Sequence, residues 1–286
     1  MTDMSTDTSS DTSTDTSSDT SGVSPVGADV PRRDTELPAP VRHFSIDCDG
    51  ETLSCAEVVP RASRAPSPLA AVVLHGAGNG DKQSPTVLAT HLAARGHHAL
   101  AFDFSGHGAS TGLLRELSLR RRFEQARTVI DSQLPAARGL LLIGFSMSGQ
   151  TVADLAAHYG PRVAAVGLGA PAVYAAEAWP VPFGAGFTGI IRTPDSWRTS
   201  PALDALRDLP GTARAVLATP AVDAVIPPTV TEAVDKALDS SDAYYSRLVF
   251  PAADHRMSMW FASDGTSRTA FLDALLGAGD TCRSRT

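Results

Sequence analysis

The sequence has few cysteines, and their positions point away from a metal site. Cys48, Cys55 and Cys282 form an odd and scattered set among 286 residues. They lack the close spacing with which cysteines hold a metal ion. We therefore expect reduced thiols in a cytoplasmic protein.

A membrane-spanning segment, a secretory signal and a basic excess are also missing. No apolar stretch approaches the roughly 18 to 20 residues that cross a bilayer. The N-terminus has neither a basic n-region nor an apolar h-region. The formal net charge is −7, and no part of the chain looks basic enough to bind nucleic acid. We expect a small-molecule substrate, no nucleic-acid or membrane partner, and no cofactor; the oligomeric state stays open.

The first 38 residues differ in composition from the rest of the chain. A four-residue repeat begins at Asp7, Asp11 and Asp15 and consists otherwise of Thr and Ser. Eight acidic residues against two arginines give this segment a net charge of −6, so the remaining chain is close to neutral. With almost nothing apolar to bury, the segment cannot offset the entropy cost of ordering. We predict a disordered acidic tail over 1–38 and a folded domain over 39–280.

The rest of the sequence alternates short apolar strand patterns with helical patterns. This alternation predicts an α/β domain with a mostly parallel, twisted sheet of about eight strands and helices on both faces. Ligands bind beyond the carboxyl ends of the strands in such sheets. The predicted strands cover 41–46, 52–59, 70–74, 98–104, 139–143, 163–168, 213–218 and 246–250. The predicted helices cover 84–95, 119–134, a stretch beginning at Met147, 229–238 and 267–276.

One serine follows the apolar strand pattern at 139–143 and precedes a predicted helix. The sequence there is Gly144-Phe145-Ser146-Met147-Ser148-Gly149. A strand-to-helix turn of this form is a nucleophile elbow, which holds the serine oxygen above the sheet. Small residues are needed two positions before and after the serine. Gly144 meets this need, whereas Ser148 stands where glycine is usual.

Together with the elbow, motifs at three other strand ends resemble the α/β-hydrolase superfamily over about residues 41 to 278. They are His75-Gly76-Ala77-Gly78, Asp103-Phe104-Ser105-Gly106-His107-Gly108-Ala109-Ser110, and the ordered pair Asp223 and His255. The resemblance implies the α/β-hydrolase fold. It also implies a nucleophile, an acid and a base in the chain order Ser146, Asp223, His255.

The expected base is the more distinctive partner of Ser146. His255 is the one histidine of eight that directly follows the last strand pattern. Asp223 follows the strand pattern at 213–218, but Thr219-Pro220 departs from the glycine that the resembling families usually have there. Asp195, Asp204 and Asp242 are weaker rivals because none follows a strand end at the right place. We expect Asp254 to be a turn residue.

Acyl transfer also needs donors for the developing oxyanion. The resemblance assigns this role to the backbone N–H groups of Met147 and Ala77. His75, Asp103 and His107 are expected to build turns. We expect Arg120, Arg121 and Arg122 to form a solvated helix face.

A segment of about forty residues, 171–210, occupies the position of the lid in the resembling families. Its aromatic content suggests a hydrophobic cleft, or else packing of the core and of the lid's underside. The candidate substrate-binding residues are Trp179, Phe183, Phe187 and Met257.

The sequence predicts a serine hydrolase that cleaves an ester or thioester with an apolar acyl part through an acyl-enzyme on Ser146. Two alternatives stay open. The same residues suit an acyltransferase, lyase or C–C hydrolase of a biosynthetic pathway, and some proteins of this fold are non-catalytic ligand-binding proteins.

Deletion of residues 1–38 is predicted to change neither the melting temperature nor kcat, because the repeat has no apolar residues that could dock on the domain. Thermal unfolding and ester turnover of the full-length and shortened proteins test this. A clearly lower melting temperature after deletion would contradict it.

Overall fold

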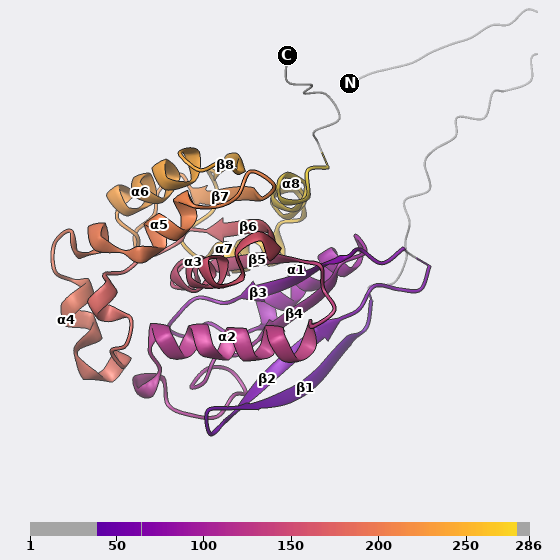
Figure 1. The fold of residues 1–286 in the computed structure, drawn as a ribbon, viewed down its shortest axis with the longest axis horizontal. Coiled ribbons are helices and arrows are strands. Elements are labelled where there is room, and N and C mark those ends of the chain that lie inside the picture. The colour runs from indigo at the N-terminus through magenta and orange to yellow at the C-terminus, as the bar shows by residue number, and fades with distance from the viewer. Residues whose placement is uncertain (1–38, 64, 279–286) are drawn as a thin grey trace, which may run out of the picture. The chain divides into compact units, whose positions relative to one another are not determined.

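The structure is a computed structural model that describes residues 39–63 and 65–278. The predicted tail and Cys282 lie outside the described residues. The described strands form one sheet in the order β1-β2-β4-β3-β5-β6-β7-β8 (Figure 1). They are β1 (Val41–Cys48), β2 (Glu51–Val58), β3 (Leu69–Leu74), β4 (His98–Phe102), β5 (Gly139–Phe145), β6 (Val163–Gly169), β7 (Arg214–Pro220) and β8 (Tyr244–Phe250). Strand β2 pairs antiparallel with β1 and β4, and the remaining pairs are parallel, so the predicted fold class is confirmed.

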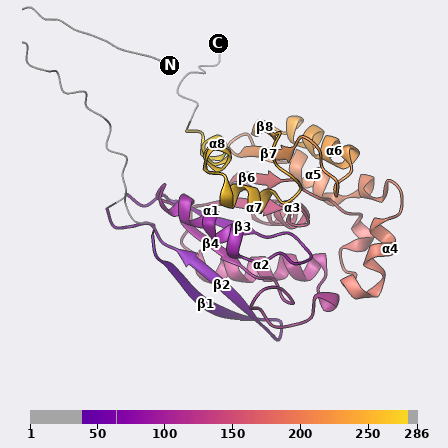
Figure 2. The ribbon, with the colours of Figure 1, turned by 180° about the vertical axis from the view of Figure 1, so that it is seen from behind.

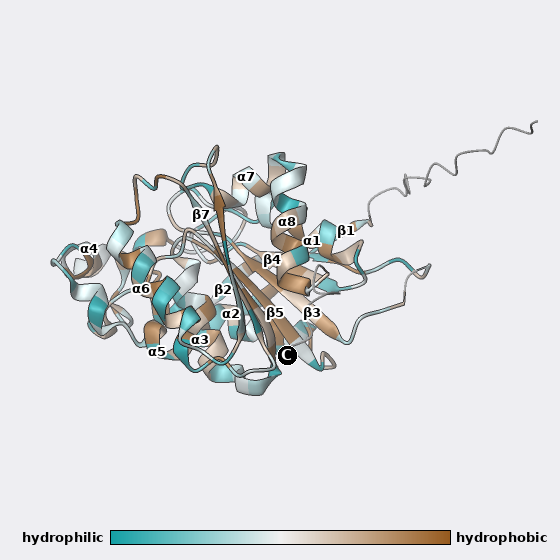
Figure 3. Cartoon of the chain, turned by 90° about the horizontal axis from the view of Figure 1, so that it is seen from above, coloured by the Kyte–Doolittle hydropathy of each residue, from teal (hydrophilic) through white to brown (hydrophobic). Residues whose placement is uncertain are grey.

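The middle strands are buried along almost their whole length, as their continuous apolar sequences predict. All residues of β5 are buried, and so are those of β3 from Ala70 onward. Figure 3 shows these strands as the hydrophobic layer between the helices. The parallel pairing of β5 with β3 and β6 brings their carboxyl ends to one edge of the sheet. Ser146 follows β5 at this edge.

Helices cover both faces of the sheet (Figures 2 and 3). One face carries α1 (Gln83–Ala93), α7 (Met257–Ser263) and α8 (Gly265–Leu276). The other carries α2 (Leu119–Gln133), α3 (Ser148–Tyr159), α5 (Pro201–Arg207) and α6 (Pro228–Asp239). Helix α4 (Thr188–Ile191) lies away from the sheet in Figures 1 and 2. Short helical turns lie between the longer elements: η1 (Leu114–Glu116), η2 (Gly160–Arg162), η3 (Ala176–Ala178), η4 (Phe183–Phe187) and η5 (Ser196–Thr199).

Some elements differ from the sequence-based prediction for identifiable reasons. Strand β4 ends at Phe102 instead of residue 104, because the backbone N–H of Phe104 donates to the His75 ring. Helix α7 was not predicted; it directly follows the His255 loop. The solvated face expected for Arg120 to Arg122 is wrong for Arg122, which is fully buried. This residue lies three positions after Leu119 and four before Ala126, so it falls on the buried face of α2.

Two thiols are buried and unbridged. Cys48 and Cys55 lie in the core, and burial raises the pKa of the Cys55 thiol to about 12. Among the described residues, no helix has the length and apolar character needed to span a membrane.

Two polar residues of α3 hold the segment that follows β6. The Gln150 side-chain oxygen accepts from the Tyr174 N–H at 3.0 Å and the Ser200 hydroxyl at 3.2 Å. The Asp154 carboxylate accepts from the Gln150 amide at 2.8 Å and the Trp179 indole N–H at 3.0 Å. Both ends of this segment are therefore fastened to the helix that begins beside Ser146.

Burial raises the pKa of Asp154 from 3.8 to about 6. The folded protein thus holds the proton more tightly than the unfolded chain does. The stability that this contributes is full below about pH 3.8 and is lost as the pH rises through about 6.

We predict that the free energy of unfolding of the wild type falls relative to that of Asp154→Asn between about pH 4 and about pH 7, by roughly 1 to 3 kcal/mol. Urea unfolding of both proteins at the two pH values measures the difference. Asp204→Asn is a matched control, since the Asp204 side chain is 73% exposed. A difference between wild type and Asp154→Asn that stays constant with pH would disprove the assignment.

Candidate active site

Ser146 lies in a tight, strained turn between β5 and α3. Its φ is +51°, which a residue with a side chain rarely adopts. The Ser146 N–H donates to the Gly169 carbonyl at 3.0 Å, and its carbonyl accepts from Gly149 and Ala172. Both peptide groups of the serine are therefore fixed by β6 and the segment after it.

Glycines around Ser146 are required by close backbone approaches. A Cβ added at Gly144 would lie 2.6 Å from the Ser148 carbonyl oxygen. A Cβ at Gly149 would lie 2.5 Å from the Pro171 side chain. At Gly76 it would lie 3.2 Å from the Ser146 Cβ, so the loop after β3 passes directly beside the serine.

A chain of hydrogen bonds joins the three side chains that the resemblance singled out. His255 Nε2 lies 2.9 Å from Ser146 Oγ, and His255 Nδ1 lies 2.9 Å from Asp223 Oδ2. A carboxylate can only accept, so Nδ1 carries the proton and Nε2 can accept from the serine hydroxyl. The His255 and Asp223 side chains are 17% and 10% exposed. The arrangement is that of a serine activated by an oriented base.

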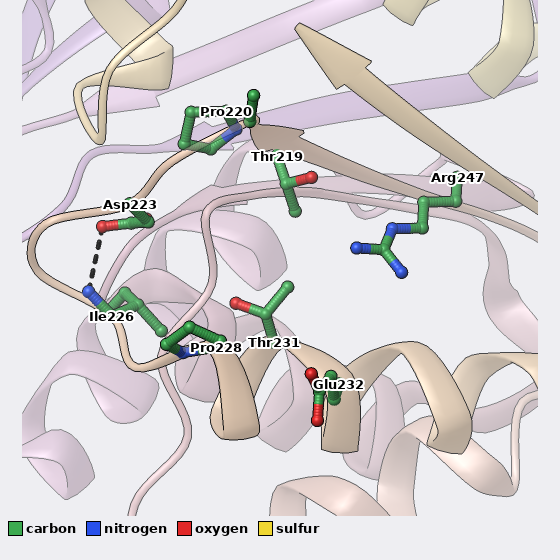
Figure 4. A pocket seen from close by; sticks show the side chains of 9 residues that line it. Thr219, Pro220, Asp223, Ile226, Pro228, Thr231, Glu232 and Arg247 are labelled. Carbon is green, nitrogen blue, oxygen red and sulfur yellow. Dashed lines mark hydrogen bonds between the residues drawn. The ribbon is translucent and has the colours of Figure 1, made fainter. Parts of the chain in front are cut away.

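The loop after β7 aims Asp223 at His255 despite its unusual sequence. Strand β7 continues through Thr219 and Pro220, so the departure from glycine falls within the strand. Asp223 Oδ1 accepts from the Val225 N–H at 2.8 Å and from the Ile226 N–H at 2.9 Å; Figure 4 shows the bond to Ile226. The other carboxylate oxygen, Oδ2, thereby remains available to accept from His255 Nδ1. A cavity of about 110 Å³ is lined by this loop, the end of β7 and the start of α6 (Figure 4).

Other aspartates contact different partners. Asp195 pairs with Arg198, and Asp204 with Arg207. Asp254 precedes His255 but its carboxylate binds Arg256, whose hydrogen bonds lower the pKa of Asp254.

The N–H groups predicted to bind an oxyanion are those of Met147 and Ala77. Neither donates a hydrogen bond to another residue within the described ranges. Both residues border one hydrophobic cluster, in which buried Leu119, Met147, Ala178 and Phe187 contact Ala77, Trp179 and Phe183.

The residues expected to build turns do so. The neutral His75 ring donates from Nδ1 to the Gly76 carbonyl at 2.6 Å and accepts at Nε2 from the Phe104 N–H at 3.1 Å. Burial, followed by the charge of Arg122, lowers the pKa of His75. The Asp103 carboxylate binds Lys82 and the Ala109 N–H, and His107 packs beside the His75 ring.

A cavity of about 420 Å³ opens beside Ser146. Its wall includes Ala77, Phe145, His255, Met257 and Met259. Of the four predicted substrate-binding residues, Met257 lines it. Trp179, Phe183 and Phe187 lie outside its wall, because they pack in the cluster around Met147. Within residues 39–63 and 65–278, no three His, Cys, Asp or Glu side chains are grouped so that they could hold a metal ion.

Two groups of residues near the site were missed at the sequence level. Arg122 was assigned to the wrong face of α2, although its spacing from Leu119 indicated burial. Gln150 and Asp154 carry no motif; their spacing of four residues on α3 is a weak signal, and only the fold gives them partners.

The serine aminopeptidase S33 family model matches residues 66–194, which is less than half of the chain. A search of curated proteins found no match. Solved structures with the same fold include Est1E from Butyrivibrio proteoclasticus with ferulic acid bound, at 18% identity and a TM-score of 0.62, covering 82% of this chain and 99% of that one. The thioesterase domain from the curacin biosynthetic pathway is 15% identical, with a TM-score of 0.58 and coverage of 82% and 99%.

A serine hydrolase from Xanthomonas campestris, described as lacking a lid, is 18% identical with a TM-score of 0.57 and covers 86% of this chain and 99% of that one. The strand order, the elbow after β5 and these matches show that the chain has the α/β-hydrolase fold.

Proposed function

We propose that this chain is a serine hydrolase that cleaves an ester or thioester with an apolar acyl part. The observation that carries the proposal is the hydrogen-bonded series from Asp223 through His255 to Ser146, with 2.9 Å at each step. A serine hydroxyl is a poor nucleophile without such a base, and the base needs an acid to fix its tautomer.

The reaction would proceed in two halves. Ser146 Oγ attacks the acyl carbon while His255 Nε2 takes its proton, and the N–H groups of Met147 and Ala77 stabilise the oxyanion. His255 then gives the proton to the leaving group, and an acyl-enzyme remains on Ser146. Water activated by His255 hydrolyses that intermediate and restores the serine.

The cavity supports an apolar acyl part. Phe145, Met257 and Met259 line the cavity beside Ser146; Met259 is 55% exposed, whereas Phe145 and Met257 are buried behind it. A thioesterase domain and an esterase that binds ferulic acid share the fold, which favours carbonyl substrates of this kind. We propose a small-molecule substrate and a cytoplasmic place of action, in keeping with the unbridged Cys48 and Cys55.

Ser146→Ala is predicted to lower kcat for p-nitrophenyl esters or acyl-thioesters by roughly 10³-fold or more, because the nucleophile is lost. His255→Ala should be about as damaging, since the two residues act as a unit. Chain-length series of both substrates measure turnover, and a fluorophosphonate probe reports labelling of Ser146.

Ser132→Ala is the control, because Ser132 is an exposed residue of α2 whose hydroxyl bonds only within its helix. It should keep full activity and labelling. Turnover by pure, folded Ser146→Ala at the wild-type rate would end the nucleophile assignment.

Asp223→Asn is predicted to lower kcat by roughly 10²- to 10⁴-fold, less than Ser146→Ala. Asparagine keeps the size of the side chain but removes the charge that stabilises the imidazolium. Asp254→Asn is the matched control, because this neighbour of His255 binds Arg256 instead. The reverse pattern, with Asp254→Asn impaired and Asp223→Asn normal, would show that Asp223 is not the acid.

A further inference from the structure

Arg122 is a buried cation beside the site. Its side chain is 0% exposed, and its guanidinium lies 3.7 Å from the centre of the Phe104 ring. Nη2 donates to the His75 carbonyl at 2.8 Å and to Ser148 Oγ at 2.7 Å. Nε and Nη1 are buried without a hydrogen-bond partner. In the part of the chain that the structure describes, no carboxylate forms an ion pair with Arg122.

Such a residue is costly to keep. Burial of a charge without a counter-ion opposes folding, and burial lowers the pKa of Arg122 to about 9. That value still lies above neutral pH, so the guanidinium is charged at pH 7. Because burying this charge opposes folding, the two hydrogen bonds that Arg122 makes need a functional explanation.

Both bonds of Arg122 lead to the same carbonyl group. Ser148 Oγ donates to the His75 carbonyl at 2.6 Å, and it also accepts from Arg122. Ser148 stands two residues after Ser146, where glycine is usual at a nucleophile elbow. The Ser148 hydroxyl, which stands in place of the usual glycine, therefore links α3 to α2 and to the loop after β3. It does so by its hydrogen bonds with Arg122 and with the His75 carbonyl oxygen.

The next peptide group along this loop joins the Gly76 carbonyl to the Ala77 N–H, which is the expected oxyanion donor. The Gly76 carbonyl accepts from the His75 ring, so the Ala77 N–H, on the opposite edge of the same planar trans peptide, points away from that ring. The Gly76 backbone lies against Ser146. A rotation of the His75 carbonyl would therefore turn the Ala77 N–H relative to Ser146.

We propose that Arg122 and Ser148 are positioning residues of the oxyanion hole, which act through the His75 carbonyl to hold the Ala77 N–H toward the oxygen that becomes negative. This rests on the proposed function, since it assumes acyl transfer at Ser146. Burial and, after it, the positive charge of Arg122 lower the pKa of His75, which favours the neutral ring whose Nε2 accepts from the Phe104 N–H.

The test compares Arg122→Met, Ser148→Gly and the double variant with the wild type. Methionine removes the donors and charge but fills the space, and glycine restores the residue usual at an elbow. We measure kcat and KM for a p-nitrophenyl ester, and the affinity for a trifluoromethyl ketone, whose adduct with serine places an oxyanion in the hole.

We expect Arg122→Met to lower kcat by roughly 10- to 100-fold, less than the 10²- to 10³-fold that follows loss of a whole donor. Ketone affinity should fall by a similar factor, while KM changes by less than about threefold. Ser148→Gly should give a smaller loss of the same kind. The double variant should lose less than the product of the single effects, because both residues act on one carbonyl.

Arg127→Met is the matched control. Arg127 is an exposed arginine of the same helix, with its guanidinium 5.9 Å from the Phe123 ring. It should keep wild-type kcat and ketone affinity.

Two results would overturn the positioning role. In one, folded Ser148→Gly and Arg122→Met keep wild-type kcat and ketone affinity. In the other, kcat of the folded variants falls while their ketone affinity does not. If the wild type itself does not react with a fluorophosphonate, the proposed function fails, and the positioning role falls with it.

Discussion

The positive φ of Ser146 is the constraint on which the surrounding structure depends. A residue with a side chain holds such a conformation only when its neighbours leave no alternative. Here β6 takes the Ser146 N–H, the segment after β6 takes its carbonyl, and the glycines at 76, 144 and 149 let three chain segments approach within contact distance. The turn lifts the hydroxyl off the sheet edge, where a side chain from the loop after β8 can reach it.

The loops that meet Ser146 are each fixed by the hydrogen bonds of polar side chains. Asp223 uses one carboxylate oxygen to bind two N–H groups of its own loop and the other to orient His255. His75 fastens the loop after β3 to the loop after β4, while Gln150 and Asp154 fasten the segment after β6. The His75 bond is buried and those of Gln150 and Asp154 are partly buried, so these bonds cost more to break than a surface bond does. These hydrogen bonds therefore fix the positions of the loops around Ser146 in the absence of a substrate.

Two departures from the superfamily pattern have different physical consequences. Thr219 and Pro220 extend β7 and leave Asp223 within hydrogen-bond distance of His255, so the loop accommodates the missing glycine. Ser148 instead adds a hydroxyl inside a crowded turn, and that hydroxyl finds partners in Arg122 and the His75 carbonyl. The proteins of the same fold described above are only 15 to 18% identical to this chain, so local differences in turn sequence and hydrogen bonding are expected.

The sequence by itself determined the sheet with its two helical layers, the elbow at Ser146, and the order of Ser146, Asp223 and His255 along the chain. Hydrophobic periodicity and turn residues are local, so short windows of sequence contain them. Only the tertiary structure decided which groups Arg122 binds, that Phe187 joins the hydrophobic cluster of Met147, and that Met257 lines the cavity. The partners of these side chains come from strands and helices far away in the sequence. The hydrogen bonds and cavity contacts at such positions depend on how the layers pack, which no local pattern encodes.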